Sequence, residues 1–141
     1  MKQRPMQKGL IIVAATLEQL IDFIQFKDAA MEKRVLASWP GPVTWLLPAR
    51  SHVPLWIRGA HSTIAVRVSA HPGVQALCNK AGPLVSTSAN PGNCPPAKTA
   101  RKVIQYFGPA VDYVFHGQLG TSASPTEIRD AATGELIRAG N

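Results

Sequence analysis

The segment Leu10–Ala14 is the feature that most constrains the fold of this chain. Its residues, Leu-Ile-Ile-Val-Ala, form a continuous apolar run directly after Gly9. A short apolar run without polar alternation is typical of a strand that is buried on both faces of a sheet. We therefore expect a central strand here.

Helical and strand patterns alternate along the rest of the chain, which predicts a mixed α/β layer fold. Thr16 and Gln19 have the spacing of a capping box, and Leu17, Leu20, Ile21 and Ile24 follow at helical spacing. Further helices are expected over 28–38, 72–80 and 99–107. Strands are expected at 43–47, 62–68, 84–85 and 113–115, with a hairpin formed by 126–130 and 135–138.

Several apolar side chains are expected to face the core. Val74, Leu77 and Cys78 have the spacing of an inward helix face. The segment 50–59 is irregular and basic, and Trp56 is its expected anchor.

The charge distribution indicates an anionic partner. The net charge is +7, and the section from Lys33 to Val111 holds nine lysines and arginines but no aspartate or glutamate. Such a section should carry a positive field that attracts a nucleotide, pyrophosphate or nucleic acid. A generally basic, soluble surface is the alternative. Because this section lacks carboxylates, Mg²⁺ working here would be held mainly by substrate phosphates and water.

A polar loop follows the apolar pair Leu84-Val85. It offers hydroxyls, an amide and approachable backbone N–H groups, which suit a phosphate or carboxylate better than proton chemistry. Strand ends that open into such loops often bind ligands in α/β sheets. The alternative is an Asx or ST turn without a ligand. The polar residues are Ser86, Thr87, Ser88 and Asn90.

Arg67 is unusual because it lies between Val66 and Val68 in an expected strand. Its side chain should point to the opposite face from those two valines. An arginine in an apolar strand is normally paired or bound to an anion, since burial of a lone charge is costly. No acid lies nearby in the sequence, so an anionic ligand and an exposed sheet face are the two interpretations.

Several function classes lack their signatures. The sequence has no run of 18 apolar residues, no Gly-rich phosphate or dinucleotide fingerprint, and no signal-peptide pattern. The four histidines and the two cysteines, Cys78 and Cys94, have no metal-ligand spacing. We expect no membrane association, no protein-held metal and a cytoplasmic location. The chemistry predicted is positioning and charge stabilisation.

Six segments, taken together and in order, resemble the YrdC-type threonylcarbamoyl-AMP synthase family. The resemblance covers essentially the whole chain. The segments are Lys2-Gln3-Arg4-Pro5 with Lys8-Gly9, Trp39-Pro40-Gly41-Pro42-Val43-Thr44, Ala65-Val66-Arg67-Val68, Ser86-Thr87-Ser88-Ala89-Asn90, Ser124-Pro125-Thr126-Glu127-Ile128-Arg129-Asp130 and Leu136-Ile137-Arg138-Ala139-Gly140.

The resemblance implies a nucleotidyltransferase with a twisted mixed sheet flanked by helices. Such an enzyme makes L-threonylcarbamoyl-AMP and pyrophosphate from L-threonine, bicarbonate or CO₂, and ATP, with Mg²⁺ held mainly by the ATP phosphates. Partner proteins then transfer the threonylcarbamoyl group to adenosine 37 of tRNA.

The same resemblance assigns roles to individual residues. Lys2 and Arg4 would contact phosphates or the substrate carboxylate, and Arg67 would face the phosphate chain as the third catalytic residue. The nucleotide and substrate would be bound by Ser86, Thr87, Ser88 and Asn90, with Thr44, Thr126 and Arg138 lining the same cavity.

The chain also departs from the family. It is expected to be one domain over residues 1–141 that lacks the family's N-terminal segment. Apolar faces such as Leu10–Ala14 would then be partly uncovered. The alternatives to the synthase are therefore a non-catalytic module that binds tRNA or double-stranded RNA and an inactive truncated paralogue.

Overall fold

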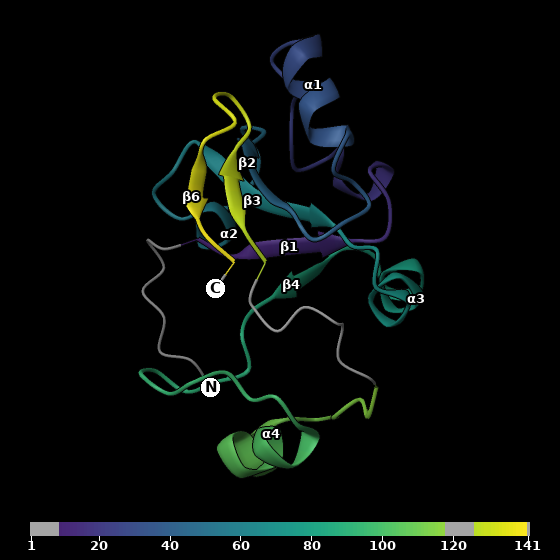
Figure 1. The fold of residues 1–141 in the computed structure, drawn as a ribbon, viewed down its shortest axis with the longest axis vertical. Helices are drawn as coiled ribbons and strands as arrows, with labels where there is room; N and C mark the ends of the chain where they lie inside the picture. Colours follow the sequence, from purple (N-terminus) through teal and green to yellow (C-terminus); the bar gives the residue numbers. More distant parts are fainter. Residues whose placement is uncertain (1–8, 118–125, 141) are drawn as a thin grey trace.

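The computed structural model describes residues 9–117 and 126–140, which form one mixed sheet with helices around it (Figure 1). The strand order is β4-β1-β3-β2-β5-β6. β1 pairs in parallel with β3, and β2 with β5, whereas the other neighbours are antiparallel. The predicted mixed α/β fold and C-terminal hairpin are confirmed. The strands are β1 (Ile11–Ala14), β2 (Thr44–Pro48), β3 (Thr63–Val68), β4 (Leu84–Ser86), β5 (Ile128–Asp130) and β6 (Leu136–Arg138).

The helices predicted over 28–38, 72–80 and 99–107 are present. They begin where side chains accept hydrogen bonds from first-turn amides: Asp28 from Met31 N at 2.7 Å and Thr99 from Lys102 N at 3.1 Å. The helical elements are α1 (Ala29–Leu36), α2 (Leu55–Arg58), α3 (Pro72–Ala81) and α4 (Ala100–Phe107), with the 3₁₀ turns η2 (Glu18–Leu20) and η3 (Gly108–Ala110).

One face of the sheet carries the main hydrophobic core, and we call it the core face. It buries alternate residues of the central strands, because successive side chains of a strand point to opposite faces. α1 contributes Met31 and Val35 to the same cluster. The strand residues of this face are Ile12, Ala14, Trp45, Leu47, Ile64, Val66 and Val68.

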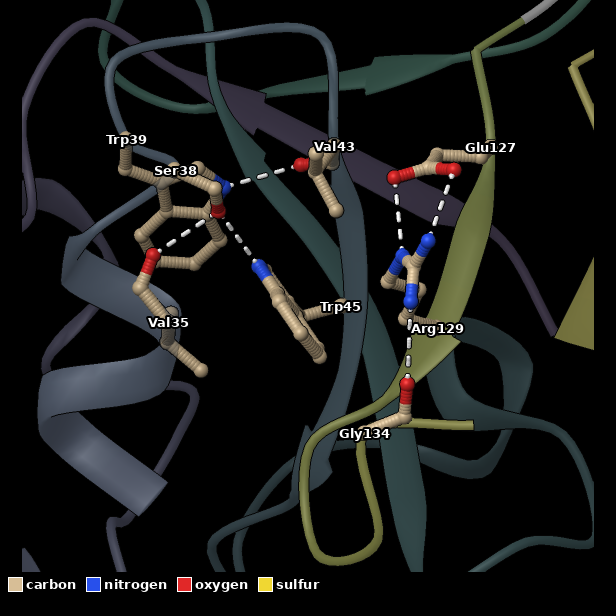
Figure 2. Close-up of polar contacts among 8 residues, drawn as sticks. All are labelled: Val35, Ser38, Trp39, Val43, Trp45, Glu127, Arg129 and Gly134. Carbon is tan, nitrogen blue, oxygen red and sulfur yellow. Dashed lines mark hydrogen bonds and ion pairs between the residues drawn. The ribbon is translucent and has the colours of Figure 1, made fainter. Parts of the chain in front are cut away.

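Two tryptophans anchor the start of β2 to the end of α1 (Figure 2). Trp39 Nε1 donates to the Val43 carbonyl at 2.9 Å, and Trp45 Nε1 donates to Ser38 Oγ at 2.8 Å. The Ser38 hydroxyl in turn donates to the Val35 carbonyl at 2.9 Å. Buried indole N–H groups need such partners. The network fixes the segment that carries Thr44 between Val43 and Trp45.

The helix predicted from the capping box at Thr16 is wrong. The segment forms only the short turn η2, whose N-cap is Leu17 without a side-chain hydrogen bond. Gln19 Oε1 instead accepts from Ala15 N at 2.9 Å, and its Nε2 donates to the Cys78 carbonyl at 2.8 Å. The glutamine therefore joins the end of β1 to α3 rather than capping a helix.

Two predicted positions of apolar side chains and one predicted strand are also wrong. Trp56 is 55% exposed, and Ile57 is the buried residue of α2. Leu77 is exposed on α3, whereas Cys78 is buried. The predicted strand 113–115 is irregular, with its aromatic side chains exposed, because no described strand pairs with it.

The strand predicted at 84–85 is present as β4, which is an edge strand among the described residues and leaves Val85 exposed. The expectation that Leu10–Ala14 would be partly uncovered holds only for Leu10 and Ile11, which are half-buried. β1 lies between β4 and β3, and its last three residues are buried. Uncovered apolar surface occurs instead on α4, which has no buried residue and lies apart from the sheet (Figure 1).

Candidate functional site

A cavity of about 1130 Å³ lies over the sheet face opposite the core face. We call this face the cavity face. Its central row is built by strand register: Leu46 pairs with Ala65, Ala65 with Ile11, and Ile11 with Ser86. α3 covers part of the same face near Val13. The cavity therefore lies over the strands rather than at the carboxyl ends of parallel strands, where the sequence rule places ligands.

Most of the predicted site residues lie together. Lys2 and Arg4 fall outside the described residues. Asn90 is not among the residues that line the cavity, and its Nδ2 donates to the Cys94 carbonyl at 2.6 Å, which holds the loop after β4 in shape. The predicted residues that line the cavity are Thr44, Arg67, Ser86, Thr87, Ser88, Thr126 and Arg138.

Arg67 is the central cation of the cavity face. It is half-buried, and its Nη1 donates to Thr126 Oγ1 at 2.7 Å. Within residues 9–117 and 126–140, Nε has no hydrogen-bond partner and the guanidinium has no acidic partner. Desolvation lowers the pKa of Arg67, because burial disfavours the charged form. A half-buried cation with one neutral partner is suited to an anionic ligand.

Thr44 carries the second side-chain polar atom on this face that has no hydrogen-bond partner among the described residues. It is fully buried, and its Oγ1 has no hydrogen-bond partner among the described residues. Trp45 pairs with Val66, so the antiparallel register continues with Thr44 beside Arg67. Two buried polar groups without full satisfaction therefore lie next to each other, which is uncommon in folded proteins and typical of functional sites.

The β5–β6 hairpin holds the outer wall of the cavity. Arg138 Nη2 donates to the Thr126 carbonyl at 3.2 Å, so Thr126 accepts from two arginines. Thr44 N donates to the Glu127 carbonyl at 3.0 Å, which joins the hairpin to β2.

The hairpin is itself stiffened by an ion pair (Figure 2). Arg129 Nε and Nη2 contact the two Glu127 carboxylate oxygens at 2.8 and 3.3 Å, and Nη1 donates to the Gly134 carbonyl at 3.1 Å. The hydrogen bond and the charge of Glu127 raise the pKa of Arg129. Arg34 Nη1 also donates to the Ala131 carbonyl at 2.6 Å, which attaches the hairpin to α1.

Other residues of the cavity lining were not predicted from the sequence as site residues, and they include Gly9, Arg58, His61 and Lys98. Gly9 has a φ of +60°, and a Cβ there would lie 2.9 Å from the Arg58 carbonyl oxygen. Glycine is required at this close approach. Arg58 and Lys98 belong to the acid-free section, and this was the only sequence pattern that could have indicated them as contacts for an anion. No sequence pattern indicated His61.

The cavity has a donor set for anions rather than for metals. Its described lining contains hydroxyls, arginines, a lysine and a histidine, and no carboxylate. In the part of the chain that the structure describes, no group of three or more His, Cys, Asp or Glu side chains could hold a metal ion.

Among the described residues, no helix is both long enough and apolar enough to span a membrane.

Comparison with known proteins gives relatives along nearly the whole chain. Over 138 residues it is 46% identical to a threonylcarbamoyl-AMP synthase of Pseudomonas aeruginosa (strain UCBPP-PA14), covering 98% of this chain and 75% of that protein. Over 142 residues it is 48% identical to a protein of the same name from Pseudomonas putida, covering 99% and 76%. The chain thus spans about three quarters of these curated relatives.

Solved structures share the fold. The crystal structure of P. abyssi Sua5 complexed with L-threonine superposes with a TM-score of 0.86 at 29% identity, covering 97% of this chain and 41% of that one. The structure of E. coli YciO superposes with a TM-score of 0.81 at 26% identity, covering 98% and 68%. This chain therefore spans less than half of the Sua5 protein.

A family profile matches residues 1–140, namely that of the Sua5/YciO/YrdC family, which is described as "Telomere recombination". The match, the identities and the shared sheet agree with the family that the six sequence segments predicted. The chain belongs to the Sua5/YciO/YrdC family.

Proposed function

We propose that this chain is a threonylcarbamoyl-AMP synthase, an enzyme that forms L-threonylcarbamoyl-AMP and pyrophosphate from L-threonine, bicarbonate or CO₂, and ATP. The observation that carries the proposal is the 46% identity over 98% of the chain to a protein of that name. The cavity supports it, since a space of about 1130 Å³ with hydroxyls and cations suits a nucleotide and a small amino acid.

The proposed chemistry needs no protein nucleophile. The amine of threonine attacks CO₂ and forms a carbamate with release of a proton, whereas with bicarbonate the same carbamate forms with loss of water. A carbamate oxygen then attacks the α-phosphorus of ATP, and the bond to the pyrophosphate oxygen breaks. Negative charge grows on the departing pyrophosphate, so fixed cations lower the barrier by electrostatic stabilisation.

The roles of individual residues follow from the contacts. Arg67 has a guanidinium edge without a partner among the described residues, and we assign it to the phosphate chain. Arg138 lies on the same wall through Thr126, and we assign it to the same charge. Ser86, Thr87 and Ser88 line the cavity beside β4 and would hold the phosphate and ribose region by hydroxyl and backbone groups.

Mg²⁺ would enter as the ATP complex, held by phosphate oxygens and water. The described lining offers no carboxylate to hold the ion, so we assign it no protein ligand. Lys2 and Arg4 remain proposed phosphate or carboxylate contacts outside the described residues.

The product is an activated carbamoyl donor, so we propose that it is consumed by proteins that modify tRNA. On the same basis we propose a cytoplasmic location. The alternative of a non-catalytic RNA-binding module is not favoured by the relatives' names.

The test is calorimetric titration of ATP into the full chain with L-threonine, bicarbonate and Mg²⁺, followed by measurement of pyrophosphate release. We expect saturable one-site binding, together with release that requires L-threonine and is not supported by D-threonine. A chain that is folded by circular dichroism but neither binds ATP nor releases pyrophosphate would refute the proposal. Binding of tRNA under the same conditions without ATP binding would favour the alternative.

A further inference from the structure

Two apolar surfaces outside the large cavity are uncovered among the described residues. One is the helix α4, and the other is a small cleft beside the C-terminal end of α1. Figure 1 shows α1 at the top of the molecule and α4 at the bottom, at the two ends of its long axis. Because the two surfaces lie at opposite ends of one chain, α4 can meet such a cleft only on another copy.

The helix α4 is amphipathic, and its apolar face is not packed against the sheet. Val103, Ile104 and Phe107 have the spacing of one helix face. No residue of the helix is buried, and Ile104 is 52% exposed. Arg101 and Lys102 lie beside this face, and neither has an acidic partner among the described residues. A basic amphipathic helix of this kind is typical of a surface that binds another macromolecule.

The cleft beside α1 is small and apolar. It has a volume of about 200 Å³, and apart from Thr16 its lining side chains are apolar, among them Leu17, Leu36 and Trp39. It shares no lining residue with the large cavity. Pockets for small molecules usually have volumes of about 300–1,000 Å³. The cleft therefore suits an apolar side chain of a protein rather than a nucleotide or a cofactor.

Acidic side chains lie beside the cleft. Glu18 directly follows the lining residue Leu17, and Glu32 lies one helical turn before the lining residue Leu36 on α1. A hydrogen bond from the Thr16 side chain lowers the pKa of Glu18, so this carboxylate is charged at neutral pH. We call the cleft together with Glu18 and Glu32 the acidic cleft.

The charges of α4 and of the acidic cleft are complementary. The segment 18–32 contains four acids and one lysine, whereas α4 belongs to the section that contains nine bases and no acid. Arg34, on the same helix as Glu32, donates to the Ala131 and Ala132 carbonyls instead of pairing with an acid. Opposite charges on two surfaces favour their association and fix its orientation.

We propose that this chain associates head to tail, with α4 of one copy docked in the acidic cleft of a second copy. Ile104 would occupy the cleft, and Arg101 and Lys102 would lie near Glu18 and Glu32. The contact is heterologous, so each added copy still presents one α4 or one acidic cleft to the next. This association goes beyond the proposed function and is measured without substrate.

The test is sedimentation equilibrium of the full chain at increasing concentration. The weight-average mass should rise above that of one chain between about 10 and 500 µM, because a contact of one short helix is weak. Ile104→Glu and Leu36→Arg should each weaken the association by about tenfold or more, since each places a charge in an apolar contact beside like charges. Leu55→Glu, at an exposed position on α2, is the matched control and should associate within about twofold of the parent.

A mixture of the two variants tests the head-to-tail geometry. Ile104→Glu keeps an intact acidic cleft, and Leu36→Arg keeps an intact α4. An equimolar mixture should therefore form a dimer with one copy of each variant, which neither variant forms alone and which does not grow further. Both positions are exposed, and circular dichroism checks that the variants fold. If Leu36→Arg does not fold, Leu36→Gln takes its place.

The dependence on salt tests the role of charge. Association of the parent chain should weaken by about threefold or more between about 50 and 500 mM NaCl, because salt screens the attraction. Association that strengthens with salt would overturn the proposed pairing of charges. A parent chain that remains monomeric at every concentration would overturn the proposal, and so would a mixture of the two variants that remains monomeric. Association of Leu36→Arg with itself would indicate instead that α4 pairs with α4.

Discussion

The two faces of the sheet use alternate residues of the same strands for different ends. On β3, Ile64, Val66 and Val68 lie in the hydrophobic core, whereas Arg67 faces the cavity. On β2, Leu47 lies in the core, whereas Thr44 faces the cavity with a hydroxyl that has no partner among the described residues. The core face is filled by packed apolar side chains, whereas the cavity face presents polar side chains that a ligand could contact. Substitutions at two adjacent residues of one strand should therefore have different effects, one on the free energy of unfolding and the other on ligand binding.

The largest expected effect is on the core face. Leu47 is fully buried, so Leu47→Ala should lower the free energy of unfolding by about 3 kcal/mol through lost burial and a cavity. The neighbouring Leu46 is half-buried on the cavity face, and Leu46→Ala is the matched control, with an expected loss of about 1 kcal/mol. Urea denaturation measures both. Equal losses would contradict the division between the faces.

The next largest effect is expected on the cavity face, where a substitution should weaken ligand binding but change stability little. Arg67→Ala should weaken ATP binding by about tenfold or more, since a hydrogen bond to a charged group contributes about 1.5–3 kcal/mol. The free energy of unfolding should change little, because the guanidinium has no acidic partner among the described residues. Calorimetric titration and urea denaturation of the same variant separate the two. A large stability loss with intact ATP binding would indicate a structural role instead.

The division between the core face and the cavity face could be predicted from the sequence only where a residue belongs to a recognisable local pattern. Arg67 was identified from the sequence because a charge between valines in a strand is conspicuous, and strand alternation then gives its face. The core strand β1 was recognised for the same local reason, an unbroken apolar run.

Features set by distant contacts escaped prediction. Gln19 has the spacing of a capping residue, but its side chain instead accepts a hydrogen bond from the Ala15 amide and donates one to the Cys78 carbonyl. Thr126 could be named only by family resemblance, since its contact with Arg67 joins residues 59 positions apart. Trp56 was predicted as an anchor, but Ile57 is the buried residue of α2; on α3 the predicted inward position of Cys78 is confirmed, whereas Leu77 is exposed.

A smaller effect is expected at the polar loop after β4. Ser88 lines the cavity and is exposed, so Ser88→Ala should leave the free energy of unfolding within about 0.5 kcal/mol of the parent. ATP binding should weaken by about fivefold, the loss of roughly one neutral hydrogen bond. Ser51→Ala, at an exposed position outside the cavity lining, is the control. An unchanged affinity would remove Ser88 from the nucleotide site.

The smallest effect tests whether the unpaired hydroxyl of Thr44 is kept for a ligand at the expense of stability. Thr44→Val removes a fully buried Oγ1 that has no partner among the described residues, while the Thr44 N–H bond to Glu127 remains possible. Loss of an unsatisfied polar group should raise the free energy of unfolding by about 1 kcal/mol. ATP or threonine binding should weaken by about threefold if the hydroxyl serves a ligand. Thr44→Ser keeps the hydroxyl and should retain binding, with a lower stability from the lost methyl group. A decrease in the stability of Thr44→Val would mean that Oγ1 is already satisfied in the ligand-free protein. The hydroxyl of Thr44 would then have a structural role, as the core residues do, and its presence on the cavity face would not indicate a contact with a ligand.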